Sequence, residues 1–183
     1  IGGSTNALLH LPAIAAELGL ELDPEIFNEI NSCIPHIGNI NPSGQHLTES
    51  FWFAGGIPRV QMLLEKYLDL DVMTVTGKTL GDNLETLRKD HFLERGRGYL
   101  QNYHLSPEDV ITPVETTKDM GSIAVLKGSL APEGAVVKYS ACEKSMRSHT
   151  GRAVVFDCEE DAHEAVVKGK IRPGEIIVIR YEG

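Results

Sequence analysis

The chain has 183 residues and a mass of 20.0 kDa, which is enough for one large domain or two small ones. Its 42% of hydrophobic and 23% of charged residues exclude a wholly disordered chain, and the formal net charge of −9 disfavours a nucleic-acid-binding surface. No apolar stretch approaches the ~20 residues that a membrane-spanning helix requires. The composition therefore favours a globular protein with neither a nucleic-acid partner nor a membrane partner.

The three cysteines lie far apart, at Cys33, Cys142 and Cys158, and predict neither a disulfide framework nor a zinc ribbon. Lone cysteines outside a basic environment are usually small buried hydrophobic residues, which we favour here over nucleophiles or cluster ligands. This cysteine usage is typical of a reducing compartment, and we expect the protein in the cytoplasm.

Apolar residues three to four positions apart predict that the first half of the chain is helical. The first helix is predicted from Asn6 to Leu18, with Ser4, Thr5 and Asn6 as candidate caps. The spacing places Leu8, Leu11, Ala15 and Leu18 on roughly one face of this helix. Further helices are predicted to begin at Asp23-Pro24, to cover 48–53, to begin near Pro58 and continue to Tyr67, and to cover 79–89.

Short strands rich in β-branched residues are predicted in the second half, over 122–126, 135–140, 153–157 and 175–181. One helix lies between the last two, with Asp157 as its predicted N-cap, Glu160 completing a capping box and Gly169 ending it. Residues 90–121 have scattered charge and little periodicity, and we place the domain boundary there. Since natural domains seldom begin on a glycine turn and end directly after an apolar run, we expect a piece of a longer protein.

The segment Gly2-Gly3-Ser4-Thr5-Asn6 is the best candidate site in the sequence. At a helix start, unpaired N–H groups together with two hydroxyls and an amide can hold a carboxylate or a phosphate. A plain turn and helix cap explains the same residues. His10 lies one turn further on, where it could face the same site or be a partly buried structural histidine.

Other patterns that carry chemistry are weaker. Thr76-Gly77-Lys78-Thr79 is similar to the end of a phosphate-binding P-loop, but Val72 stands where the first glycine of that motif is required. A strand, a tight turn and a helix cap explain this segment better. The seven histidines have no metal-ligand spacing, and Arg95-Gly96-Arg97-Gly98 is too short for a nucleic-acid patch in a chain of this charge.

Longer blocks of the sequence resemble one known family in their order along the chain. They are Gly2-Gly3-Ser4-Thr5-Asn6-Ala7-Leu8-Leu9-His10-Leu11, Asn41-Pro42-Ser43-Gly44, Ala54-Gly55-Gly56-Ile57-Pro58, Thr74-Val75-Thr76-Gly77-Lys78-Thr79-Leu80, residues 128–138 (GSLAPEGAVVK), Val155-Phe156-Asp157, residues 169–175 (GKIRPGE) and Ile179-Arg180-Tyr181-Glu182-Gly183. Together these blocks span nearly the whole chain. On them the sequence resembles the dihydroxy-acid dehydratase and phosphogluconate dehydratase family.

The resemblance implies a hydro-lyase that removes water from a 2,3-dihydroxy carboxylic acid to give a 2-keto acid. It also implies an iron–sulfur cluster and a magnesium ion, because a hydroxide leaves poorly until a cation takes its charge. The cluster cysteines, the magnesium ligands and the serine base of the family match no position of this chain, so no catalytic, cofactor-binding or metal-binding residue is assigned in it. What carries over is the Gly2–Asn6 segment, and we expect Ser4, Thr5 and Asn6 to bind the substrate carboxylate or to support the site.

The resemblance further implies an α+β architecture, in which an α-rich part precedes a β-barrel-like swivelling β/β/α domain. We therefore expect 1–90 to belong to the helical domain, 91–121 to be a linker and 122–183 to begin the β-rich domain. The main interpretation is a fragment of the dihydroxy-acid dehydratase of branched-chain amino-acid biosynthesis, inactive by itself. A sugar-acid (aldonate) dehydratase and a non-catalytic module that keeps the fold are the alternatives. The expected partners are a small hydroxy acid and a second copy of the full-length protein.

Overall fold

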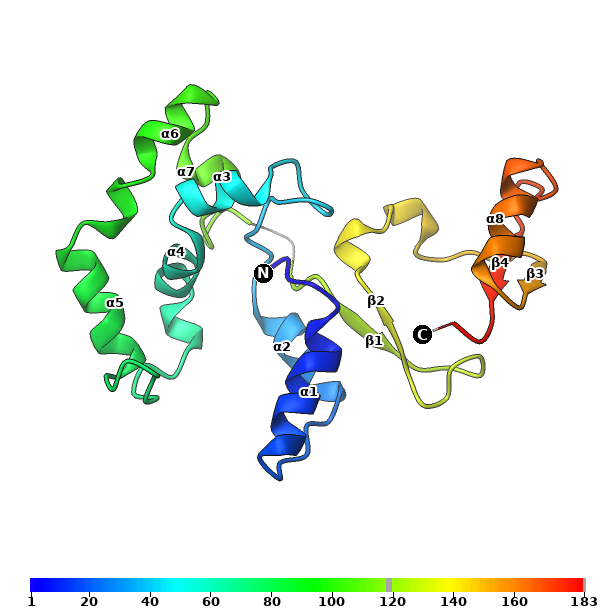
Figure 1. Cartoon of the computed structure of the whole chain (residues 1–183), viewed down its shortest axis with the longest axis horizontal. Coiled ribbons are helices and arrows are strands. Elements are labelled where there is room, and N and C mark those ends of the chain that lie inside the picture. Colours follow the sequence, from blue (N-terminus) through cyan, green and yellow to red (C-terminus); the bar gives the residue numbers. More distant parts are fainter. Residues whose placement is uncertain (118–119, 183) are drawn as a thin grey trace. The chain divides into compact units, whose positions relative to one another are not determined.

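The computed structural model describes residues 1–117 and 120–182. The chain divides into two compact units, Ile1–Cys142 and Glu143–Gly183. Figure 1 shows that the first unit contains helices followed by a β-hairpin, whereas the second contains two strands and a helix. In the first unit the elements are α1 (Ala7–Glu17), α2 (Glu25–Cys33), α3 (Thr48–Phe53), α4 (Gly56–Leu63), α5 (Leu80–Lys89), α6 (Arg97–Asn102), α7 (Pro107–Val110), β1 (Ala124–Leu126) and β2 (Ala135–Val137). The second unit contains β3 (Ala153–Phe156), α8 (Glu159–Val167) and β4 (Ile176–Ile179).

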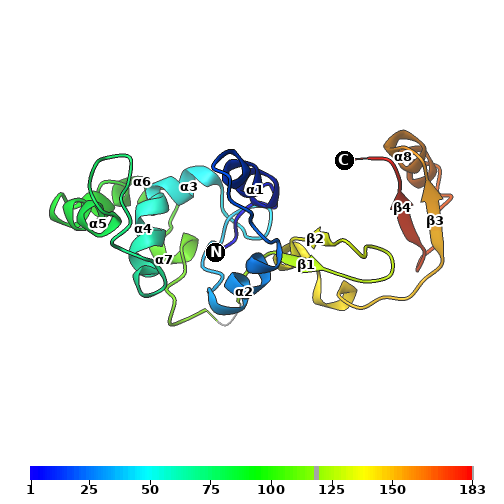
Figure 2. The ribbon, with the colours of Figure 1, turned by 90° about the horizontal axis from the view of Figure 1, so that it is seen from below.

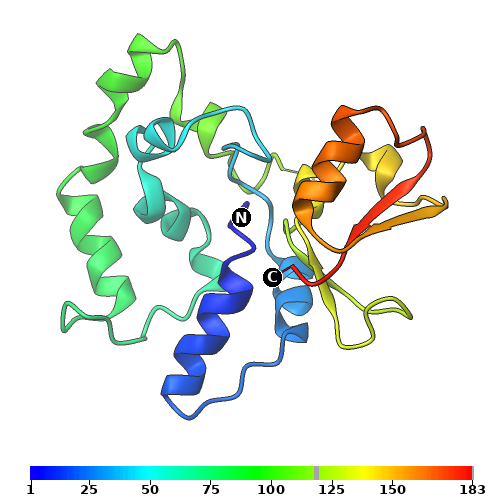
Figure 3. The same ribbon diagram turned by 45° about the vertical axis from the view of Figure 1, so that its right-hand side comes forward.

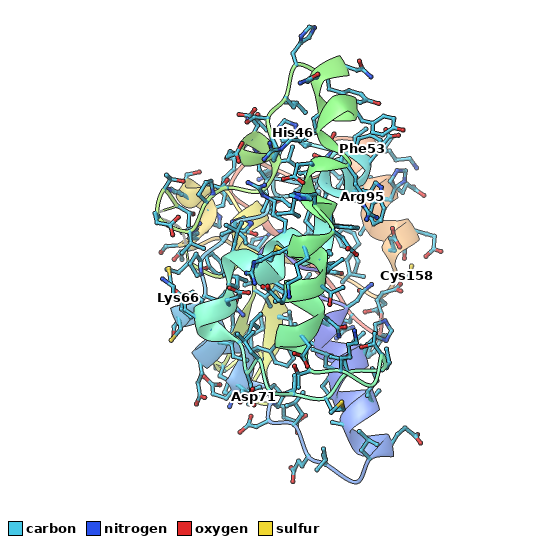
Figure 4. All side chains as sticks on the ribbon, turned by 90° about the vertical axis from the view of Figure 1, so that its left-hand side faces the viewer. His46, Phe53, Lys66, Asp71, Arg95 and Cys158 are labelled. Carbon is cyan, nitrogen blue, oxygen red and sulfur yellow. The ribbon has the colours of Figure 1, made fainter. Side chains whose placement is uncertain are left out.

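The core of the first unit lies where α3, α4, α6 and α7 meet. Its most buried large side chains are Ile37, Leu100, Val110 and Ile111, each at most 1% exposed. Phe53 at the end of α3, labelled in Figure 4, stacks on Tyr99 of α6 with the ring centroids 4.8 Å apart. Burial of each of these aliphatic side chains contributes about 1.5–3 kcal/mol to the stability of the helical part.

Part of the segment predicted to be a linker, residues 91–121, belongs to this core. The segment contains α6 and α7, and its Leu100 and Val110 are fully buried. An ion pair of 2.7 Å between Arg59 of α4 and Glu108 also ties α7 to the helices before it. The compact units divide between Cys142 and Glu143. The division of the whole protein into 1–90, 91–121 and 122–183 stays a prediction.

Helix α1 forms where the periodicity predicts it and continues through Pro12, but it buries none of its residues. Leu11 of the apolar face is 48% exposed, and Leu18 just beyond the helix is 71% exposed. The apolar face of α1 is therefore only partly covered by the described residues. Periodicity identifies which face of a helix is apolar, but it does not say what covers that face.

Strand β1 lies between a strand and a helix, as Figure 2 shows. On one side it pairs antiparallel with β2, with Ala124 opposite Val137 and Leu126 opposite Ala135. On the other side lies α2, where the Asn31 carboxamide oxygen accepts the N–H groups of Ser122 at 2.8 Å and Ile123 at 3.2 Å. The polar side chains of α2 thus take the place of a third strand.

The second unit is a β–α–β arrangement. Strands β3 and β4 are parallel, with Ala153 opposite Ile176 and Phe156 opposite Ile179. Helix α8 connects them, as parallel pairing requires, and buries Ala162 and Ala165 (Figure 3). The predicted strands and helix are all present here.

The predicted cap of α8 is wrong. Cys158, not Asp157, is the N-cap residue of α8, and the side chain of this cap residue makes no capping bond. The Asp157 carboxylate instead accepts hydrogen bonds from the Arg180 guanidinium, at 2.8 Å from Nε and 2.5 Å from Nη2. Both guanidinium N–H groups donate to the same oxygen, Oδ1, and such charge-assisted hydrogen bonds are stronger than a bond to a neutral donor. The N–H of Glu159 is satisfied by the carboxylate of Glu182 at 2.9 Å.

At a coarse level the fold mixes helices with small sheets, as an α+β class requires. The described residues form two sheets of two strands each, and neither closes into a barrel. Within 1–117 and 120–182, no helix has the length and apolar character needed to cross a lipid bilayer.

Candidate functional site

The candidate site begins at Gly2, which is buried and has a φ angle of +95°. A Cβ atom at this position would lie 2.8 Å from Nε2 of His36 and 3.2 Å from the carbonyl oxygen of Gly38. The neighbouring carbonyl of Ile1 accepts the N–H of Gly38 at 3.0 Å. Only glycine combines this backbone conformation with this close approach, so the turn is held tightly against the 36–38 segment.

Ser4 is the residue that caps α1 in practice. Its hydroxyl oxygen accepts the N–H of Asn6 at 3.2 Å, and its carbonyl accepts the N–H of Ala7, also at 3.2 Å. Asn6 itself has helical backbone angles and makes no side-chain capping bond. Within the described residues, the Thr5 hydroxyl and the Asn6 carboxamide make no hydrogen bond to protein. Of the three predicted site residues, Thr5 and Asn6 therefore have polar groups available to a ligand.

Two hollows of the first unit border this turn and divide the three predicted site residues. A largely apolar hollow of about 680 Å³ is lined by Ser4, Ala7, Ile30, Ile34, Leu64, Ile123 and eight other residues. A smaller one of about 380 Å³ is lined by Thr5 and Asn6 on one side and by Glu133, Gly134 and Ala135 on the other. The fold therefore brings residues 5–6 together with the start of β2, although more than 120 positions separate them.

Lys138 connects the end of β2 to the same turn. Its ammonium nitrogen lies 3.4 Å from the carbonyl oxygen of Gly2. The side chain is partly buried, and desolvation lowers the pKa of its ammonium group below the usual value. The sequence analysis does not identify Lys138 as a site residue. A lysine that directly follows the apolar residues of a predicted strand is the pattern that could have identified it.

Cys33 lines the large apolar hollow beside Ser4, whereas Cys158 and His10 line neither of the two hollows that border the turn. Cys33 ends α2 and is exposed, which contradicts the expectation of a buried residue, and Cys158 begins α8 in the second unit (Figure 4). The backbone N–H of Asp161 lowers the pKa of the Cys158 thiol, but burial and the nearby acidic groups of Asp161 and Glu160 raise it by more, so its net pKa is raised.

His10 is exposed, so it is not a partly buried structural histidine. Among residues 1–117 and 120–182, no three His, Cys, Asp or Glu side chains gather as a metal site would need.

The segment similar to a P-loop is a turn and a helix cap, as the sequence predicts, but in place of the predicted strand there is only an isolated β-bridge between Met73 and Thr79. The Thr79 hydroxyl accepts the N–H of Asp82 at 3.1 Å and caps α5. Thr74 and Asn83 close the preceding turn, since the Asn83 amide donates to the Thr74 hydroxyl at 2.8 Å. The polar groups of this segment are engaged with each other, which fits a structural role.

Comparison with known proteins identifies relatives over the whole chain. A family model described as Dihydroxy-acid/6-phosphogluconate dehydratase N-terminal matches residues 1–83, and the C-terminal model of the same family matches residues 109–183. Dihydroxy-acid dehydratase 1 of Methanosarcina acetivorans is 45% identical over 183 residues. The dihydroxy-acid dehydratases of Methanococcoides burtonii and Solidesulfovibrio magneticus are 45% and 46% identical over 183 and 185 residues.

Each alignment covers 100% of this chain, and the chain spans 31% of the length of these relatives. The two family models match in the order N-terminal, then C-terminal, and together they cover most of the 183 residues. The blocks quoted from the sequence, including the Gly2–Asn6 turn and residues 128–138, lie within the matched ranges. The chain belongs to the dihydroxy-acid/6-phosphogluconate dehydratase family.

Proposed function

We propose that this chain is part of a hydro-lyase that converts a 2,3-dihydroxy carboxylic acid into a 2-keto acid. The observation that carries the proposal is identity of about 45% over the whole chain to proteins named dihydroxy-acid dehydratase. Within that class, the proposed enzyme is the dihydroxy-acid dehydratase of branched-chain amino-acid biosynthesis. It acts on a small acid, forms a homodimer and works in the cytoplasm.

In this reaction a base removes the proton from carbon 2, and the hydroxyl group leaves from carbon 3. The proton and the hydroxyl together make the released water. The remaining enol gains a proton at carbon 3 and loses the proton of its hydroxyl group at carbon 2, which gives the 2-keto acid. Throughout these steps the substrate carboxylate keeps its negative charge, so a site that holds this carboxylate fixes both reacting carbons relative to the base.

We assign the carboxylate-holding role to the Gly2–Asn6 turn, with Ser4, Thr5 and Asn6 as its binding residues. The Thr5 hydroxyl and the Asn6 amide are hydrogen-bond donors that border the same hollow. Both lie at the amino end of an eleven-residue helix, where the helix dipole favours a negative charge. Ser4 contributes by shaping the turn, because its hydroxyl holds the N–H of Asn6.

The proposal includes an iron–sulfur cluster and a magnesium ion, as the family implies, with ligands outside this chain. The donor set of the described residues does not fit either group: Cys33 and Cys158 lie in different units, and no cluster of His, Cys, Asp and Glu side chains is present there.

The test is an assay of the full-length protein after anaerobic reconstitution with iron, sulfide and magnesium. Formation of the 2-keto acid is measured with 2,3-dihydroxy-3-methylbutanoate and, in parallel, with gluconate. We expect kcat/KM to be higher for the branched-chain substrate. A higher kcat/KM for gluconate would show that the substrate is a sugar acid. Turnover of neither compound would favour a non-catalytic module.

A further inference from the structure

The basic side chains of the described residues fall into two groups by burial. Nearly all are exposed, and only Arg59 and Lys138 are partly buried. Arg59 has a counter-charge, because its guanidinium lies 2.7 Å from a carboxylate oxygen of Glu108. Lys138 has no carboxylate of the described residues within ion-pair distance, and its ammonium group contacts the uncharged carbonyl of Gly2 at 3.4 Å.

A cation that is removed from water without a counter-charge is unfavourable, because a carbonyl dipole replaces only part of its hydration. The lowered pKa of Lys138 has this same physical cause, namely desolvation. An anion placed beside such a group offsets this cost. The chain has 26 acidic residues for 17 basic ones, so a missing counter-charge does not follow from a shortage of carboxylates.

The position of Lys138 indicates which anion it meets. Gly2, the residue it contacts, opens the turn that leads to Thr5 and Asn6. The strand that ends just before Lys138 begins at Ala135, which lines the same hollow as Thr5 and Asn6. Lys138 therefore contacts the first residue of the turn, whereas Thr5 and Asn6 of the same turn line the hollow at the start of the strand, together with Glu133.

We propose that Lys138 is a substrate-binding residue, whose ammonium group pairs with the carboxylate of the organic acid held at the Gly2–Asn6 turn. This inference rests on the proposed function for the identity of the acid. The pairing itself requires only a small carboxylate. Lys138 supplies the charge, while the turn supplies the directed hydrogen bonds.

The first experiment measures binding to the full-length protein by calorimetry. The ligands are 2-keto-3-methylbutanoate and its primary amide, which has nearly the same shape but no charge. Hydrogen bonds to charged groups contribute roughly 1.5–3 kcal/mol, so Lys138→Met is expected to weaken binding of the acid about ten- to a hundredfold. Binding of the amide should change less than twofold, and Lys138→Arg should retain part of the preference for the acid.

Lys127→Met is the matched control. Lys127 lies on the same hairpin, but it is exposed and pairs with Glu25 at 3.7 Å. Its replacement is expected to leave the affinity for the acid unchanged. A Lys138→Met protein that melts at a lower temperature yet binds the acid as tightly as the parent overturns the proposal, since Lys138 then only supports the Gly2 carbonyl.

A second experiment needs no variant and decides the question if Lys138→Met does not fold. Acetic anhydride labels lysines according to their accessibility, and mass spectrometry reports each site. We expect 2-keto-3-methylbutanoate to protect Lys138 while its amide does not, with exposed Lys78 as an internal control. Equal labelling of Lys138 with and without the acid contradicts the inference. If the acid protects Lys138 in a protein that dehydrates neither substrate, the result supports this inference and contradicts the proposed function.

Discussion

The side chain of Asn28 replaces a neighbouring strand for Val125. Its carboxamide nitrogen donates to the Val125 carbonyl at 2.9 Å, and its oxygen accepts the Val125 N–H at 2.8 Å. Both backbone polar groups of a residue that is 8% exposed are thus satisfied by one side chain. The arrangement fixes the hairpin that carries Lys138 against α2, and α2 in turn borders the hollow beside Ser4.

The first prediction concerns this pair. Asn28→Ala leaves a buried N–H and a buried carbonyl without partners, which costs about 1–3 kcal/mol. We expect the amide hydrogen of Val125 to exchange faster by the corresponding factor in native-state hydrogen exchange. Asn102→Ala, an exposed change in α6, is the control and should leave this exchange rate unaltered. Equal exchange rates in the two variants would show that the side-chain pair is not stabilising.

The second prediction concerns the glycine turn, where two adjacent glycines differ. Gly2→Ala places a Cβ 2.8 Å from His36 Nε2 at a φ of +95°, whereas a Cβ at Gly3 meets nothing within 4 Å. Strained backbone of this kind costs about 1–3 kcal/mol. We expect Gly2→Ala to lower the melting temperature by several degrees and Gly3→Ala to lower it by less. Similar melting temperatures for the two variants would mean that the turn relaxes without penalty.

The third prediction concerns the cap of α5. Thr79→Ala removes the oxygen that accepts the N–H of Asp82 and is expected to cost about 1 kcal/mol. Thr79→Ser keeps that oxygen and should recover most of the loss. Hydrogen exchange of the first-turn amides of α5 measures the effect. A Thr79→Ser variant as unstable as Thr79→Ala would assign the loss to the methyl group rather than to the cap.

The fourth prediction concerns acid stability. Hydrogen bonds from the backbone N–H and the hydroxyl of Ser106 lower the pKa of Asp109 below 3.8. Because the folded pKa is lowered, this carboxylate stabilises the fold above pH 3.8, and the contribution is lost as the pH falls through the folded value. Melting temperatures from pH 6 to 2 should fall less steeply for Asp109→Asn than for the parent. Parallel curves would contradict this role of Ser106.

Local patterns in the sequence predict the helices and strands well, because apolar spacing and cap residues act over a few positions. They do not predict that α1 buries no residue, or that Asn28 and Val125 pair across 97 positions. The Asp157 prediction fails for the same reason, since its Arg180 partner lies beyond the next helix. In the candidate site, the turn is visible in the sequence, but the approach of Lys138 depends on the folded chain.

The last prediction separates ligand binding from helix capping at the turn. Asn6→Asp keeps the size of the side chain and places a negative charge at the amino end of α1, which the helix dipole stabilises by about 0.3–1 kcal/mol. If Asn6 serves only the helix, this variant should be as stable as the parent and as active. If Asn6 donates to the substrate carboxylate, the variant loses the donor and repels the ligand. We then expect kcat/KM of the reconstituted full-length protein to fall at least tenfold, with the melting temperature unchanged or higher. Thr5→Val removes a donor without adding charge, and its kcat/KM should also fall by about tenfold. Parent-like kcat/KM for both variants would leave the turn a purely structural role.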